Sequence, residues 1–210
     1  MICFHRSIKY VNMNWPNKLT MGRIIAIPVM IVIAYIPYLQ STFFCEVSYA
    51  NFINFIIFAL ASCTDFLDGF LARKYKLITT FGKFADPLAD KILVLISFLI
   101  LFMQKRMVVI GSVSLELVPM WGIAIILLRE FTVSGVRLVA AQSGQVIAAG
   151  WSGKVKTFET MVAIGFLFFA GLHQAIAIIG LVLMYLSVIL TLYSGIEYIW
   201  NSRKIIFESI

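Results

Sequence analysis

The chain has 210 residues, of which 61% are hydrophobic and 13% charged, and its mean hydropathy is +0.97. A soluble domain carries about a quarter charged residues and could not bury this much apolar surface, so soluble globular, disordered and fibrous proteins are excluded. The net charge of +7 favours contact with anionic membrane lipids over nucleic acid, and the composition predicts an integral membrane protein.

Six apolar stretches are long enough to cross the hydrocarbon core of a bilayer as helices. In chain order they are Ile24–Phe44, Val47–Thr64 with a helical extension toward Arg73, Asp86–Gln104, Leu117–Leu128 running on through Arg129 and Arg137, Val155–Leu172, and Ala175–Ile196. Lipid favours helices because backbone groups must be paired within the span. We therefore expect an all-α bundle of six transmembrane helices at 20–200, preceded by a cytoplasmic or interfacial segment at 1–19 and followed by a cytoplasmic tail at 201–210.

The basic residues predict the orientation of this bundle. With both termini on one side, 15 of the 17 Lys and Arg residues fall on that side, and only Lys105 and Arg106 fall opposite. Cytoplasmic segments of membrane proteins are enriched in Lys and Arg. We therefore expect cytoplasmic termini and cytoplasmic loops at 73–85 and 142–154. The cytoplasmic membrane of a bacterium is favoured over an organelle, because no transit segment is recognisable.

Four of the ten acidic residues stand close together in the sequence: Asp65, Asp68, Asp86 and Asp90. Helical spacing places the first two on one helix face and the last two on one face of the next helix. A short loop between these helices would bring the four carboxylates together at the cytoplasmic interface. Their repulsion would be relieved by divalent cations, and hard oxygen ligands suit Mg²⁺ or Mn²⁺. Gly69 and Ala72 keep the same stripe free of bulk, so that a ligand could approach the backbone.

Two other interpretations of the acidic cluster stay open. The first pair of carboxylates could form interfacial salt bridges with Arg73, Lys74 and Lys91, although ionisable residues within spans are usually functional. A divalent-cation transporter could also use a buried acidic cluster. Against a transporter, the acids gather at one membrane face, and the sequence shows no inverted repeat.

The pattern D-x2-D-G-x2-A-R-x8-G-x3-D-x3-D over residues 65–90 resembles the signature of the CDP-alcohol phosphatidyltransferase family at every fixed position. The resemblance implies a six-helix membrane enzyme, a homodimer, that uses two divalent metal ions to transfer the phosphatidyl group of a CDP-linked lipid to an alcohol with release of CMP. By position, it implies that Asp90 is a metal ligand and also the catalytic base. The remaining metal ligands would be Asp65, Asp68 and Asp86, and the CDP-lipid contacts would be Asp65, Gly69, Ala72, Arg73 and Gly82.

Further blocks resemble the branch of this family whose acceptor is glycerol 3-phosphate. These blocks are Asn17–Arg23 with Pro28, Arg129–Arg137, Gly153–Thr157 and Leu192–Tyr198. The resemblance implies transfer of the phosphatidyl group from CDP-diacylglycerol to glycerol 3-phosphate.

The basic residues of the second half agree with a phosphorylated acceptor. Cations beside a carboxylate site suit an acceptor that carries its own phosphate. We expect the following residues to bind glycerol 3-phosphate: Arg129, Arg137, Lys154 and Lys156. Charge alone does not separate this acceptor from an inositol phosphate, and phosphatidylglycerol, the acceptor of a cardiolipin synthase, is a further alternative.

Overall fold

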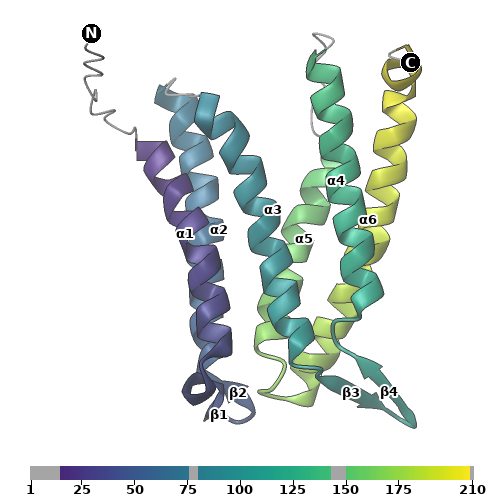
Figure 1. Ribbon diagram of the computed structural model, residues 1–210. Helices are drawn as coiled ribbons and strands as arrows, with labels where there is room; N and C mark the ends of the chain where they lie inside the picture. The colour runs from purple at the N-terminus through teal and green to yellow at the C-terminus, as the bar shows by residue number, and fades with distance from the viewer. Residues whose placement is uncertain (1–14, 76–79, 143–149, 209–210) are drawn as a thin grey trace, which may run out of the picture.

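The computed structural model of the protein describes residues 15–75, 80–142 and 150–208, with side chains described at 17–64, 85–138, 140 and 150–203. These ranges contain six α-helices: α1 (Trp15–Tyr35), α2 (Tyr49–Tyr75), α3 (Thr80–Met103), α4 (Met120–Gln142), α5 (Trp151–Phe168) and α6 (Gln174–Glu208). The helices run alternately up and down, so the start of α1 and the end of α6 lie at the same end of the bundle (Figure 1). We call this end the terminal end and the opposite one the hairpin end.

The helical architecture agrees with the all-α prediction and fits a membrane protein. Within the described part of the chain, two helical stretches, Asn17–Tyr35 and Gln174–Arg203, are long and apolar enough to cross a membrane, and Tyr49–Thr64 is a shorter apolar helix. The count of six spans, the orientation and the domain boundaries stay predictions. Helix α1 begins before residue 20 and α6 continues past residue 200.

The first predicted span, Ile24–Phe44, is wrong beyond Tyr35. Helix α1 ends at Tyr35, and the chain continues as a 3₁₀ helix η1 (Pro37–Gln40) and strand β1 (Thr42–Phe44). A proline disfavours helical backbone at the residue before it and has no N–H to donate, which explains why the helix stops ahead of Pro37. Strand β1 pairs antiparallel with β2 (Val47–Ser48).

A second hairpin joins α3 to α4. Strands β3 (Met107–Ile110) and β4 (Val113–Glu116) pair antiparallel and turn at Gly111, which has a φ of +63°. Positive φ is a conformation that glycine adopts without strain. Both hairpins lie at the hairpin end (Figure 1), where they connect helices without entering the bundle.

The helices form two groups that converge at the hairpin end and separate toward the terminal end (Figure 1). Helix α1 packs against α2 and α3, and α6 packs against α4 and α5. The two groups meet less extensively, through α3 with α4 and α5, and through α2 with α5. The buried apolar core includes Met30, Phe98, Ile164, Phe168 and Met184.

Hydrogen bonds tie the two groups together at the hairpin end. The N–H of Glu46 donates to the carbonyl of Gly171 at 3.1 Å, and Arg106 donates from Nη2 to the carbonyl of Glu46. Nearby, Gln174 Nε2 donates to the carbonyl of Val109 at 3.1 Å. The first hairpin, the α3–β3 junction and the turn between α5 and α6 are thereby held in one cluster.

The close approach at Gly171 predicts a loss of stability for Gly171→Ala. A Cβ there would overlap Arg106 Nη1 and lie 2.5 Å from the carbonyl oxygen of Glu46. Relief requires moving backbone that carries the Glu46–Gly171 hydrogen bond, so we expect a decrease of about 1–3 kcal/mol in the free energy of unfolding. Thermal unfolding in detergent measures this decrease. Gly22→Ala is the control, because a Cβ there meets nothing within 4 Å; equal effects of the two substitutions would contradict the prediction.

Candidate functional site

Asp86 and Asp90 lie one turn apart on α3, and both contact α1. Thr20 donates from Oγ1 to Asp86 Oδ1 at 2.5 Å, and Arg23 forms an ion pair through Nη1 with Asp90 Oδ1. Thr20 is 1% exposed and Arg23 2% exposed. A spacing of three residues puts these two side chains on the same face of α1. Helix α1 thus holds both carboxylates from buried positions.

The rest of the predicted carboxylate site lies on the neighbouring turns of α2 and α3. Residues 65–73 belong to the last turns of α2, and Gly82 to the first turn of α3. The side chains of Asp65, Asp68, Ala72 and Arg73, together with Gly69 and Gly82, lie outside the side chains that the structure describes. Helix α2 ends and α3 begins at the terminal end (Figure 1), as the predicted helix pair requires.

The chemistry of the described carboxylates fits a hard divalent cation. Oxygen ligands are those that Mg²⁺ and Mn²⁺ prefer. The side chain of Asp90 is 33% exposed and borders a cavity, so it can reach a ligand there. Among the described side chains, no group of three or more His, Cys, Asp or Glu could hold a metal ion. The metal site formed by four carboxylates stays a prediction, because two of its members are outside that set.

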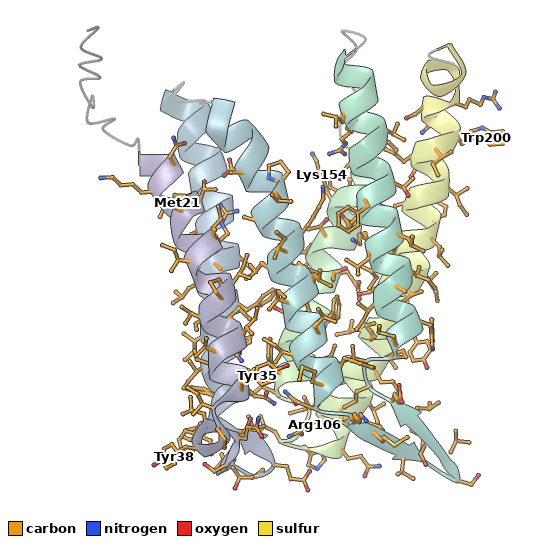
Figure 2. The ribbon with its side chains drawn as sticks, in the orientation of Figure 1. Met21, Tyr35, Tyr38, Arg106, Lys154 and Trp200 are labelled. Carbon is orange, nitrogen blue, oxygen red and sulfur yellow. The ribbon has the colours of Figure 1, made fainter. Side chains whose placement is uncertain are left out.

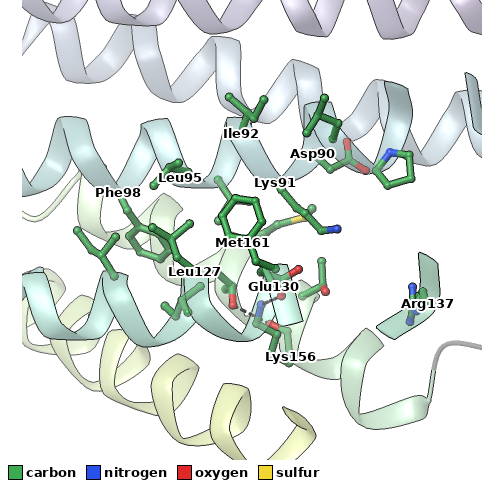
Figure 3. Close-up of a pocket in the computed structure, with 18 residues that line it drawn as sticks. Asp90, Lys91, Ile92, Leu95, Phe98, Leu127, Glu130, Arg137, Lys156 and Met161 are labelled. Carbon is green, nitrogen blue, oxygen red and sulfur yellow. Dashed lines mark hydrogen bonds and ion pairs between the residues drawn. The ribbon is translucent and has the colours of Figure 1, made fainter. Parts of the chain in front are cut away.

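A cavity of about 280 Å³ lies between α3, α4 and α5. Its charged lining residues come from all three helices: Asp90, Lys91, Glu130, Arg137 and Lys156. Its apolar lining includes Leu95, Phe98, Ile123, Ile126 and Leu127. Figure 3 shows the charged residues toward one end of the cavity and Leu95 and Phe98 toward the other. A ligand with a charged headgroup and an apolar portion fits this division.

Glu130 organises the cations on the α4–α5 side of the cavity. Its Oε1 accepts from Arg129 Nη1 at 3.0 Å and from Lys156 Nζ at 2.6 Å. Lys156 is only 3% exposed, so its ammonium depends on this carboxylate for charge compensation. One turn further along α4, Ser134 donates to the carbonyl of Glu130 at 2.6 Å and accepts from Lys91 Nζ. Glu130 and Ser134 therefore connect Lys91, Arg129 and Lys156.

The structure places the four predicted acceptor-binding cations in different surroundings. Arg137 and Lys156 line the cavity. Arg129 packs between α5 and α6: a Cβ on Gly153 would lie 3.6 Å from its Nη2, and one on Gly195 3.0 Å from its Cγ. Among the described residues, the cavity lining does not include Arg129 or Lys154.

Lys154 is exposed near the start of α5. Figure 2 shows Lys154 toward the terminal end, with Arg106 at the opposite end. Lys154 therefore lies toward the same end of the molecule as the start of α1 and the end of α6.

Sequence reasoning gave no site role to Thr20, Arg23, Lys91 or Glu130. Thr20 and Arg23 lie three residues apart in the Asn17–Arg23 block. This spacing indicates that they share a helix face, but it does not indicate which helix that face contacts. Glu130 is an acid that follows an apolar run, a position where burial requires a partner. The sequence indicated Lys91 only as a possible salt-bridge partner of the α2 carboxylates, and in the structure it bonds to Ser134.

Comparisons with known proteins find similarity to one family of membrane enzymes over most of the chain. The sequence model of the family described as CDP-alcohol phosphatidyltransferase matches residues 13–193. A CDP-diacylglycerol–glycerol-3-phosphate 3-phosphatidyltransferase of Bacillus subtilis is 36% identical over 199 residues, covering 91% of this chain and 97% of that protein. One of Rickettsia felis is 34% identical, covering 92% and 98%. A probable phosphatidylglycerophosphate synthase of Mycobacterium tuberculosis is 36% identical, covering 91% and 82%. With a family match that extends from α1 to α6 and includes both described carboxylates, the chain belongs to the CDP-alcohol phosphatidyltransferase family.

Proposed function

We propose that the protein transfers the phosphatidyl group of CDP-diacylglycerol to sn-glycerol 3-phosphate, giving phosphatidylglycerophosphate and CMP. The observation that best supports this proposal is a cavity lined by the Asp90 carboxylate together with Lys91, Arg137 and Lys156. A carboxylate beside several cations suits an acceptor that offers a hydroxyl for deprotonation and a phosphate for binding. The relatives from Bacillus subtilis and Rickettsia felis are CDP-diacylglycerol–glycerol-3-phosphate 3-phosphatidyltransferases, which supports glycerol 3-phosphate as the acceptor. The product is the precursor of phosphatidylglycerol and cardiolipin.

Asp90 serves as the general base in this proposal. Its carboxylate takes the proton of the acceptor hydroxyl, whose oxygen attacks the β-phosphorus of CDP-diacylglycerol as the bond to the CMP oxygen breaks. Arg23 holds Asp90 through Oδ1, which fixes the carboxylate beside the cavity. Phosphoryl transfer of this kind depends chiefly on positioning and charge compensation.

The carboxylates of α2 and α3 form the proposed metal site. Two divalent ions, Mg²⁺ or Mn²⁺, would be held by Asp65, Asp68, Asp86 and Asp90. When bound, they would supply positive charge that offsets the diphosphate and the departing CMP. Thr20 keeps Asp86 oriented through its hydrogen bond. The CDP moiety would lie along Asp65, Gly69, Ala72, Arg73 and Gly82.

The acceptor phosphate is proposed to bind Arg137 and Lys156 directly. Lys154, exposed at the start of α5, attracts the anion toward the cavity. Arg129 lies outside the cavity lining and acts indirectly: it forms an ion pair with Glu130, which in turn positions Lys156. The apolar end of the cavity, toward Phe98, suits part of an acyl chain.

The protein is proposed to work as a homodimer in the cytoplasmic membrane of a bacterium. Its six helices would all span the bilayer, with the terminal end in the cytoplasm. The position of Lys154 toward the terminal end (Figure 2) supports this orientation, because cations concentrate on the cytoplasmic side. Glycerol 3-phosphate would then enter from the cytoplasm, and the lipid from the bilayer.

An acceptor panel tests the proposed function. Purified protein in detergent receives CDP-diacylglycerol, Mg²⁺ or Mn²⁺, and one of glycerol 3-phosphate, phosphatidylglycerol, inositol phosphate or serine, and CMP release is measured. We expect release with glycerol 3-phosphate alone and none in excess EDTA. Release with a different acceptor would overturn the acceptor assignment. Activity in excess EDTA would contradict the metal site, and metal flux into proteoliposomes without CDP-lipid would favour a transporter.

A further inference from the structure

Lys91 lines the cavity directly beside the proposed base. It follows Asp90 on α3, and both side chains border the cavity. Its Nζ donates to Ser134 Oγ on α4, so the ammonium reaches across from one helix group to the other. Figure 3 shows Lys91 directed from α3 toward the side of the cavity where Glu130 lies. The side chain is half-buried, which strengthens its interaction with an anion relative to a solvent-exposed lysine.

The charges around the cavity suit a dianion. Lys91, Arg137 and Lys156 contribute three positive charges to the lining, and Asp90 and Glu130 contribute two negative charges. Each carboxylate also has an arginine partner outside the lining, Arg23 for Asp90 and Arg129 for Glu130, so cations are in excess around the cavity. A phosphate monoester carries between one and two negative charges at neutral pH, so it offsets more of this excess than the alternatives do. A phosphodiester carries one, and a neutral alcohol carries none.

We propose that Lys91 is a further acceptor-binding residue, whose ammonium binds the phosphate monoester of the acceptor while Ser134 orients it. The inference rests on the proposed function and adds a third helix to the acceptor site. Because Lys91 and Asp90 are neighbours on α3, the cation that holds the phosphate and the base that takes the hydroxyl proton are fixed relative to each other. The site therefore favours an acceptor whose phosphate can reach Lys91 while its reacting hydroxyl reaches Asp90.

Steady-state kinetics of Lys91→Gln and Lys91→Arg test this role. The loss of one charge-assisted hydrogen bond predicts that Lys91→Gln raises the KM for glycerol 3-phosphate about 10- to 100-fold. The KM for CDP-diacylglycerol stays the same, and kcat changes by less than about 3-fold, because the base and the proposed metal site are intact. Lys91→Arg keeps the charge and recovers most of the affinity. Ser134→Ala, which removes only the orienting hydroxyl, gives a smaller increase in the same KM.

Inorganic phosphate supplies a readout that does not depend on turnover. It raises the thermal unfolding midpoint of the wild type, and this stabilisation is lost in Lys91→Gln. It also competes with glycerol 3-phosphate, and its inhibition constant rises in Lys91→Gln by the same factor as the KM. Lys105→Gln is the matched control, because Lys105 is an exposed cation between α3 and β3 at the hairpin end; it leaves all of these values unchanged.

The outcomes separate this inference from the proposed function. If the wild type uses glycerol 3-phosphate and Lys91→Gln leaves its KM unchanged, or raises both substrate KM values alike, the role of Lys91 is overturned and the proposed function stands. If the wild type releases CMP only with an unphosphorylated acceptor, both fail. Should Lys91→Gln not fold, Lys91→Met, which keeps the unbranched side chain without its charge, replaces it with the same expected and contradicting outcomes. Unchanged KM values and unchanged phosphate inhibition in Ser134→Ala would overturn the orienting contact.

Discussion

Asp90→Asn is expected to reduce turnover by at least about 10²- to 10⁴-fold, the usual contribution of a general base. The amide cannot accept the proton of the acceptor hydroxyl, and it is a poorer ligand than a carboxylate for a divalent cation. CMP release with saturating CDP-diacylglycerol and glycerol 3-phosphate measures the loss. Asp90→Glu keeps the charge but moves the carboxylate by one methylene, so it should also be strongly impaired.

The fold should survive Asp90→Asn. The amide oxygen can still accept a hydrogen bond from Arg23, which now contacts Asp90 Oδ1, and one negative charge is removed from an acidic cluster. The thermal unfolding midpoint in detergent should fall, because the buried Arg23 loses its charged partner, but by less than in Asp90→Ala, which also removes the hydrogen-bond acceptor. Residual turnover within a few-fold of the wild type would rule out the base role, whereas a collapse of the unfolding midpoint would assign the loss to the Arg23–Asp90 pair.

The helices could be predicted because their apolar stretches are long enough to span a bilayer. Val47–Thr64 with its extension corresponds to α2, and the stretch through Arg129 and Arg137 corresponds to α4. The hairpins were missed because hydropathy does not distinguish an apolar strand from the end of an apolar helix. Thr42–Phe44 is such a strand, and Pro37 was the available signal for the break before it.

The sequence could predict which site residues share a face of one helix, but it could not predict which residues of different helices come into contact. The spacing of Asp86 and Asp90 puts them on one face of α3, and both contact α1. Their partners Thr20 and Arg23 lie more than sixty residues earlier, and spacing within a helix carries no information about which other helix lies opposite. Glu130 was missed for the same reason, because Lys156 comes from a different helix.

Charge compensation across helices explains how the candidate site keeps so many ionic groups. Arg23 compensates Asp90 between α1 and α3, and Glu130 compensates Lys156 between α4 and α5. The two pairs lie in different helix groups, with the cavity bordered by Asp90, Glu130 and Lys156. The charges that substrates must meet are therefore held in place by partners on a second helix, and the loss of one partner should affect both binding and stability.

Glu130→Ala is expected to destabilise the protein more than Gly171→Ala does. The side chain of Glu130 is 20% exposed and that of Lys156 is 4% exposed. Removing the Glu130 carboxylate leaves the buried Lys156 ammonium without an ion-pair partner, and Arg129 loses the same partner. Breaking a buried ion pair from one side costs about 3–5 kcal/mol, which lowers the unfolding midpoint by roughly 6–20 °C in a chain of this length. Glu116→Ala, at an exposed acid on β4, is the control and should leave the midpoint unchanged.

The double variant Glu130→Ala/Lys156→Met separates stability from acceptor binding. Removing both charges eliminates the unpaired ammonium, so the double variant should recover at least half of the decrease in unfolding midpoint seen in Glu130→Ala. The remaining decrease is due to Arg129, which still lacks its partner. The KM for glycerol 3-phosphate should nevertheless stay raised about 10-fold or more, because the cation that binds the phosphate is gone. A double variant that regains both stability and acceptor affinity would show that Lys156 only compensates Glu130. One that regains neither would show that the pair does not account for the destabilisation, and Glu130 would then act chiefly through Arg129.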